Sequence, residues 1–226
     1  MSEKPILFSA TMVQAILNTK PGVWPAEPID PSKPHKWQTR RIMRPQPVYI
    51  PIEQMDKITR LCHWTYKSTC WHPDEEMTHL ALEAYAPYKT GDLLWVRETC
   101  CSPNNGEYYY YNSDYSDGAK SYWYDPAHWC DYPKWKPSIF MPREAARILL
   151  EVKTVRAERL KNISDKDLEA EGIKIECGPL TSCPECNRDS YMKLWNGLNA
   201  KRGYEWDVNP WVWGYEFMVK EIKADS

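Results

Sequence analysis

The pattern of apolar and polar positions predicts short strands joined by few helices. An apolar run at residues 5–8 predicts a strand, and Ser9 follows as the N-cap of a helix that extends to Asn18. Three further runs rich in aliphatic and aromatic residues predict strands: Leu93–Glu98, Ile148–Val155 and Val212–Ile222. Short strands with few helices indicate an α+β fold built on a curved sheet or small β-barrel.

Further helices are predicted in the second half of the chain and, more weakly, before it. Residues Ser164–Asp167 resemble a capping box that opens a short helix, and Gly172 is placed to end it. The segment Ser190–Asn199 carries apolar residues at helical spacing and predicts an amphipathic helix. Residues 73–86 show a weaker helical pattern.

Long polar or proline-rich segments separate these elements. The segment Lys20–Pro34 contains five prolines and a glycine, which excludes a helix or a central strand. We expect one domain of residues 1–226 with insertions at about 20–34, 53–86, 102–134 and 174–189. The tyrosine-rich third insertion is expected to form a hairpin or a long loop.

Composition and charge narrow the possible functions. The chain has 29 basic and 31 acidic residues, which excludes a histone-like binder with a broad positive surface. Any contact with nucleic acid must therefore be concentrated at one site. Twelve tryptophans and fifteen tyrosines indicate stacking pockets or an aromatic core. No apolar run is long enough for a signal peptide or a membrane span, so we expect a cytoplasmic protein without a membrane partner.

The segment Lys33–Arg44 concentrates positive charge. It contains five basic residues, and no acidic residue lies between Asp30 and Glu53. With the indole of Trp37 and the hydroxyl of Thr39, this segment suits a phosphate-bearing or nucleotide-like ligand. A solvated basic loop is the alternative interpretation.

Several motifs then follow in an order that resembles a known family. They are HKWQTRR at 35–41, GDLLWVRET at 91–99, WKPSIFMPREAARILLEV at 135–152, LKNISDKDLEAEGI at 160–173 and YEWDVNPWVWGYEF at 204–217. The chain resembles the ASCH-domain proteins of the PUA-like superfamily, which are often found in phage and prophage genomes. This resemblance implies a small PUA-like β-barrel with flanking short helices, a fold that often binds RNA or a modified nucleoside.

The resemblance also implies an activity. Some small ASCH proteins are amidohydrolases that remove the acetyl group from N4-acetylcytidine, using a lysine, a threonine three positions later and a glutamate from a short helix. These correspond to Lys36, Thr39 and Glu171, with Glu169 as the alternative carboxylate. Thr39 would act as the nucleophile or position a water, Lys36 would accept a proton, and Glu171 would deliver a proton to the leaving amine. The substrate-binding residues are expected to be Trp37, Arg40 and Arg41.

Other functions fit the same residues. A lysine and a threonine three positions apart are expected about once by chance, and a Lys–Glu pair can be purely structural. A non-catalytic module that binds RNA, DNA or a modified base is therefore the main alternative. A ribonuclease and a phage accessory protein that binds a host protein are further alternatives. The expected ligand is a nucleoside or single-stranded nucleic acid, RNA more than DNA, and catalysis would need no cofactor.

The cysteines suggest a structural metal. The sequence Cys183-Pro-Glu-Cys186 is a CxxC motif, which in a hairpin can hold one tetrahedral zinc through two thiolates. The expected third ligand is Cys177, and the fourth is Cys130 or a cysteine or histidine within 62–72. The alternative is that these thiols bind no metal.

Overall fold

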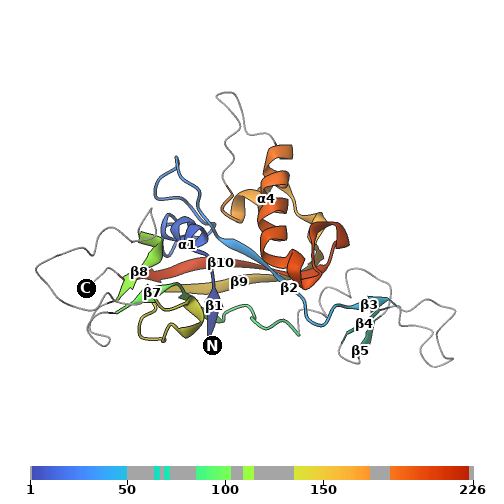
Figure 1. Cartoon of the computed structure of the whole chain (residues 1–226), viewed down its shortest axis with the longest axis horizontal. Coiled ribbons are helices and arrows are strands. Elements are labelled where there is room, and N and C mark those ends of the chain that lie inside the picture. Colours follow the sequence, from blue (N-terminus) through green and yellow to red (C-terminus); the bar gives the residue numbers. More distant parts are fainter. Residues whose placement is uncertain are drawn as a thin grey trace, which may run out of the picture. The chain divides into compact units, whose positions relative to one another are not determined.

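The structure is a computed structural model, shown in Figure 1. It describes residues 2–49, 64–66, 69–71, 85–102, 109–114, 135–173 and 184–223. The weak helix predicted at 73–86 falls almost entirely outside these ranges, as do most of the aromatic insertion and the cysteines at 177 and 183.

The described elements are mainly strands. The strands are β1 (Glu3–Leu7), β2 (Gln38–Ile42), β3 (Val48–Tyr49), β4 (Trp64–Tyr66), β5 (Thr69–Trp71), β6 (Leu93–Arg97), β7 (Cys100–Cys101), β8 (Tyr110–Tyr111), β9 (Ile148–Arg159) and β10 (Trp211–Ile222). The α-helices are α1 (Ala10–Leu17), α3 (Asp165–Ala170) and α4 (Pro184–Asn199). The 3-10 helices are η2 (Asn112–Asp114), η3 (Ser138–Phe140), η4 (Leu160–Asn162), η5 (Ala200–Arg202) and η6 (Trp206–Val208).

The main sheet has the strand order β1-β6-β9-β10-β2, in which β9 and β10 are the two long strands (Figure 1). This mixture of a five-stranded sheet and few helices confirms the predicted α+β class. The strands β1 and β2 end this order, so the described part of the sheet is open and is not the closed small barrel that was expected. Smaller sheets combine β3-β4-β5 and β7-β8.

The chain divides into two compact units. Unit 1 comprises Met1–Trp37, Gly91–Glu151 and Phe217–Ser226, and unit 2 comprises Gln38–Thr90 and Val152–Glu216. The boundary falls between Trp37 and Gln38, within the basic motif.

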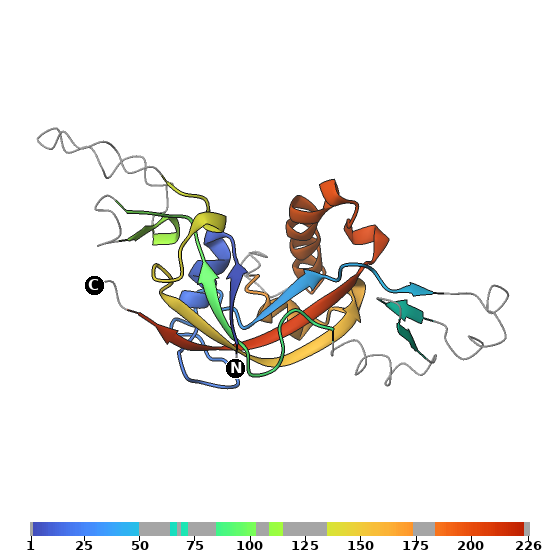
Figure 2. The ribbon, with the colours of Figure 1, turned by 90° about the horizontal axis from the view of Figure 1, so that it is seen from below.

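In unit 1, β1 runs parallel to β6, and β6 pairs with the start of β9 in the antiparallel direction (Figure 2). Ile6, Leu94 and Leu150 are buried in these three strands. Side chains alternate between the two faces of a strand, so an apolar residue at every second position is enough to make one face of such a sheet apolar. The strands predicted from the apolar runs at 5–8 and 93–98 are thereby confirmed.

Local sequence explains α1. The Ser9 hydroxyl accepts a hydrogen bond from the Met12 amide at 3.4 Å, which is the N-cap contact that the sequence predicted. Val13 and Ile16, one turn apart, are buried. The helix ends at Leu17 with Asn18 as its C-cap, as expected.

Unit 1 also contains a buried ion-pair network. The Arg147 guanidinium donates to both Glu98 carboxylate oxygens at 3.0 and 3.1 Å and to the Asp114 carboxylate at 2.6 and 2.9 Å. The Ser113 hydroxyl donates to Glu98 at 2.7 Å, and Arg147 lies 3.9 Å from the ring centroid of Tyr111. The network ties η2 to the residue that precedes β9 and to the residue that follows β6, and it leaves each buried charge paired.

In unit 2, β2 pairs with β10 in the antiparallel direction, and α3 and α4 pack on each other. An apolar cluster lies beneath them and consists of Leu160, Ile163, Leu168, Tyr191, Trp195, Trp206 and Val212. The α3 helix begins with a complete capping box, in which Ser164 and Asp167 exchange hydrogen bonds. Gly172 follows it with a positive φ of 78°, which glycine adopts without strain, so this predicted helix is confirmed.

The structure corrects the predicted start of α4. The helix begins at Pro184 rather than Ser190, so residues 184–186 are helical and do not form the expected CxxC hairpin. Proline is favoured at the first position of a helix because the N–H that it lacks would have no acceptor there.

Among the described residues, no helix is long and apolar enough to cross a membrane.

Candidate functional site

The strand β2 places a run of polar side chains inside unit 2. Gln38, Thr39 and Arg40 are all buried, at 1%, 5% and 5% exposure. The strand is held by its pairing with β10, in which Thr39 lies opposite Tyr215 and Arg40 lies opposite Gly214. Buried polar side chains require partners, so their contacts indicate what this region does.

Arg40 is the centre of a buried charge cluster. Its Nε lies 2.8 Å from Glu158 Oε1, its Nη2 lies 3.0 Å from Asp167 Oδ2, and its Nη1 donates to Glu171 Oε1 at 3.2 Å. Burial acts to lower the pKa of Arg40, but the negative charges of Glu171 and Glu158 outweigh burial and raise it. Arg40 therefore remains a cation at any pH at which the protein is folded.

The helix α3 supplies two of these carboxylates, one from each end. Asp167 lies in the first turn and Glu171 is the C-cap, one helical turn later. Asp167 also accepts hydrogen bonds from the Ser164 amide at 3.1 Å and from Arg156 Nη2 at 3.0 Å. Burial acts to raise the pKa of Asp167, but Arg40 and these donors lower it well below its usual range.

A glycine makes room for the third carboxylate. A Cβ atom on Gly214 would lie 3.0 Å from Glu158 Oε1, too close for an undisturbed contact. The absence of a side chain at this position of β10 lets the Glu158 carboxylate reach Arg40 across the sheet.

Arg41 has a different environment from Arg40. Its Nε is buried although the residue as a whole is partly exposed, and burial lowers the pKa of Arg41. The charges of Tyr88, Glu171 and Tyr215 act in the opposite direction. The Tyr88 and Tyr215 rings meet edge to face with centroids 5.2 Å apart, so Arg41 lies in an aromatic setting.

Tyr191 of α4 extends the cluster on the helix side. Burial and the nearby Glu171 raise the pKa of Tyr191 well above its ordinary value. Its hydroxyl is therefore a proton donor rather than a phenolate at physiological pH.

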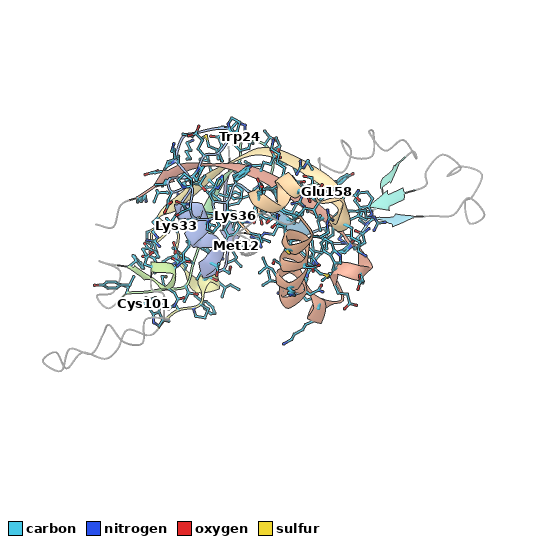
Figure 3. The ribbon with its side chains drawn as sticks, turned by 90° about the horizontal axis from the view of Figure 1, so that it is seen from above. Met12, Trp24, Lys33, Lys36, Cys101 and Glu158 are labelled. Atoms are coloured by element: carbon cyan, nitrogen blue, oxygen red, sulfur yellow. The ribbon has the colours of Figure 1, made fainter. Side chains whose placement is uncertain are left out.

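The predicted catalytic residues fall in both units. Lys36 belongs to unit 1, where it is 1% exposed and its Nζ lies 5.8 Å from the centroid of the Phe8 ring (Figure 3). Its backbone amide donates to Thr19 Oγ1 at 3.1 Å. Thr39 and Glu171 belong to unit 2. The proposed roles of the three residues stay predictions.

Within unit 2 the structure distinguishes between the candidate side chains. Glu171 is buried, whereas the alternative Glu169 is exposed, so the helix presents Glu171 to the interior. Glu171 contacts Arg40. Thr39 shares a face of β2 with Arg41, and the charge of Glu171 acts on Arg41 as well as on Arg40.

The other predicted ligand-binding residues have varied positions. Trp37 is half-buried in unit 1 and stacks on His35 with ring centroids 4.5 Å apart. Arg40 is engaged by three carboxylates in unit 2, and its role in binding substrate stays a prediction.

The predicted zinc ligands are only partly described. Cys186 lies in α4, and Cys177 and Cys183 fall outside the described residues. In the described ranges, no group of three or more histidine, cysteine, aspartate or glutamate side chains is placed to hold a metal.

Sequence reasoning missed Glu158 and Asp167 as members of the cluster, and it assigned no role to Gln38, which lies in the same strand as Arg40. Asp167 was recognised only as a capping residue, although an acidic residue that follows a predicted cap can also bind a distant arginine. Glu158 lies beyond the predicted end of its strand. Gln38 lies inside the basic motif, and the sequence carries no signal that distinguishes it from the other uncharged residues there.

The cluster fixes three carboxylates around the buried guanidinium of Arg40, in an environment where electrostatic interactions are stronger than in water. A carboxylate held in this way can exchange a proton with a bound ligand at a defined position. Buried and perturbed ionisable groups concentrate at functional sites, although structural ion pairs share this property.

Comparison of the chain with protein-family models, curated proteins and solved structures found no match.

Proposed function

We propose that this protein is a PUA-like ASCH protein that acts on a modified nucleoside. The favoured reaction is hydrolysis of an N-acylated cytosine such as N4-acetylcytidine, and the ligand is a nucleoside or single-stranded nucleic acid. Two features support this proposal: the order of sequence motifs, and the buried contact between Arg40 and Glu171 at 3.2 Å.

The contact with Arg40 is the single observation that carries the proposal. Burying a carboxylate is unfavourable unless it is paired, and Glu171 meets this condition through Arg40, which Glu158 and Asp167 also contact. Buried ionisable groups concentrate at functional sites, so a buried carboxylate beside the basic motif supports a chemical role in addition to its structural one. The exposed Glu169, two residues away in the same helix, has no such partner and serves as an internal comparison.

In the proposed reaction, the Thr39 hydroxyl, or a water that it positions, adds to the acyl carbonyl carbon. Lys36 accepts the proton of this nucleophile, which is the role that the resemblance implies. The carbon–nitrogen bond then breaks, and Glu171 serves as a shuttle that passes the proton released by the nucleophile to the departing cytosine amine. Water completes the reaction and releases the carboxylic acid, so one amide and one water yield one amine and one acid.

The test compares two matched glutamate variants. Wild type should convert N4-acetylcytidine to cytidine and acetate, and Glu171→Gln should reduce kcat/KM by about 100-fold or more, because it removes the proton donor. Glu169→Gln should leave kcat/KM unchanged. Thermal unfolding of both variants separates loss of chemistry from loss of folding. Absence of turnover by folded wild type would reject the hydrolase.

The second candidate is a module that binds RNA or a modified base without chemistry. It is favoured by Arg44, an exposed cation whose guanidinium lies 5.5 Å from the ring centroid of Tyr204. Arginine–aromatic pairs of this kind stack on bases with little sequence preference. Binding of single-stranded RNA by a protein that leaves N4-acetylcytidine intact would support this candidate instead.

A further inference from the structure

We infer that Gln38 is a specificity-determining residue, whose side-chain amide donates a hydrogen bond to a carbonyl oxygen of the bound pyrimidine. This inference rests on the proposed function and adds to it a residue that reads the base. The resemblance assigned no role to Gln38.

The amide group of Gln38 is buried and unsatisfied. Its Nε2 has no hydrogen-bond partner among the described residues, and the residue is 1% exposed. A buried amide without a partner destabilises a fold, and the great majority of such groups in native proteins are paired. A donor left open in this way is explained by an acceptor that arrives with a ligand.

The position of Gln38 relates it to the charge cluster. Gln38 and Arg40 are two residues apart in β2, so they share a face and lie about 6.6 Å apart along the strand. Arg40 contacts Glu171 at 3.2 Å, so Gln38 shares a face of β2 with a residue that binds this carboxylate. Glu216, opposite Gln38 in the register, is 3.4 Å from Arg156 Nη1.

Gln46 shows what a structural glutamine looks like in the same unit. Its Nε2 donates to the carbonyl oxygens of Met43 and Trp211 at 2.6 and 3.0 Å, and its Oε1 accepts from the Trp211 amide at 2.7 Å. Both ends of that amide are used inside the protein. The Gln46 amide therefore stabilises the fold, whereas the Nε2 donor of Gln38 is available to a ligand.

The experiment makes the same substitution at both glutamines. Methionine has a similar length and no donor. Gln38→Met should weaken binding of cytidine and N4-acetylcytidine about tenfold or more, measured by calorimetry, because a hydrogen bond to the base is lost. Its melting temperature should be unchanged or higher, since an unsatisfied donor is removed. Gln46→Met should lower the melting temperature and leave the affinity of the folded protein unchanged.

The outcomes are separable. Equal loss for both nucleosides identifies the ring carbonyl as the acceptor, and loss for the acetylated nucleoside alone identifies the acyl carbonyl. Both results support the inference, whereas unchanged affinity in Gln38→Met overturns it. Wild type that binds cytidine without hydrolysing N4-acetylcytidine rejects the hydrolase but leaves the role of Gln38 measurable. Wild type that binds neither nucleoside overturns the inference together with its ligand.

Discussion

Arg147 and Arg143 are two arginines of unit 1 with very different surroundings. Arg147 is buried and binds Glu98 and Asp114, whereas Arg143 is 39% exposed on its side chain and pairs with Glu3 at 2.9 Å. An exposed ion pair is screened by water and adds little to stability. A buried pair that loses one partner leaves an uncompensated charge in the interior.

Replacing each of these arginines by methionine tests this difference. Arg147→Met should lower the free energy of unfolding by about 3–5 kcal/mol, because it strands the Glu98 carboxylate. Arg143→Met should leave that free energy nearly unchanged. Chemical denaturation measures both, and equal effects of the two substitutions would contradict the network as a stabilising feature.

The helix α3 is held from both ends by one arginine, through Asp167 in its first turn and Glu171 at its C-cap. This arrangement fixes the short helix on β2 without a long apolar face. A six-residue helix is unstable alone, so its position depends on such contacts. Loss of either carboxylate contact should therefore affect the placement of the whole helix.

The pH dependence of stability follows from Asp167. Its pKa is lower in the folded than in the unfolded protein, so its contribution is present above the unfolded pKa and is lost as pH falls. Wild type should therefore lose stability below about pH 4, and Asp167→Asn should show a shallower loss over that range. Asp165→Asn changes an exposed acid in the same turn and is the control. The test is the unfolding midpoint of each protein measured from pH 2 to 7. The same dependence on pH in wild type and Asp167→Asn would contradict this account.

The elements that the sequence predicted well have local signals. The caps at Ser9 and Ser164 involve residues within one helical turn, so the local sequence alone identifies them. The end of β9 was placed too early, at Val155, because polar residues interrupt the apolar run. The structure continues the strand to Arg159, with Ala157 buried and Glu158 serving the charge cluster.

The basic segment illustrates what sequence could not predict. Lys36 and Arg40 are buried, so two of the five cations counted in the motif do not face solvent. Lys33 is exposed and pairs with Asp30 at 3.4 Å. The partners of Arg40 are more than 100 positions away in sequence, and only folding reveals them. Charge counting along the chain therefore overstated the positive surface of the motif.

This burial predicts a weak salt dependence of nucleic-acid binding. Few cations of the motif remain to contact phosphates, so the logarithm of the RNA affinity should fall with the logarithm of salt concentration with a slope of only about −1 to −2. This slope is measured by fluorescence anisotropy with single-stranded RNA at a series of salt concentrations from low to moderate. A slope of about −4 or steeper would show that a broad basic surface binds the phosphates after all.

The missing side chain at position 214 limits how this sequence can change. Any larger residue there would push against the Glu158 carboxylate, which in turn balances the charge of Arg40. A side chain at position 214 would therefore require the end of the Glu158 side chain to shift, and a shift would alter its contact with Arg40. The two neighbouring strands are thus linked through side-chain space as well as through their backbone pairing, so substitutions at positions 158 and 214 should not act independently.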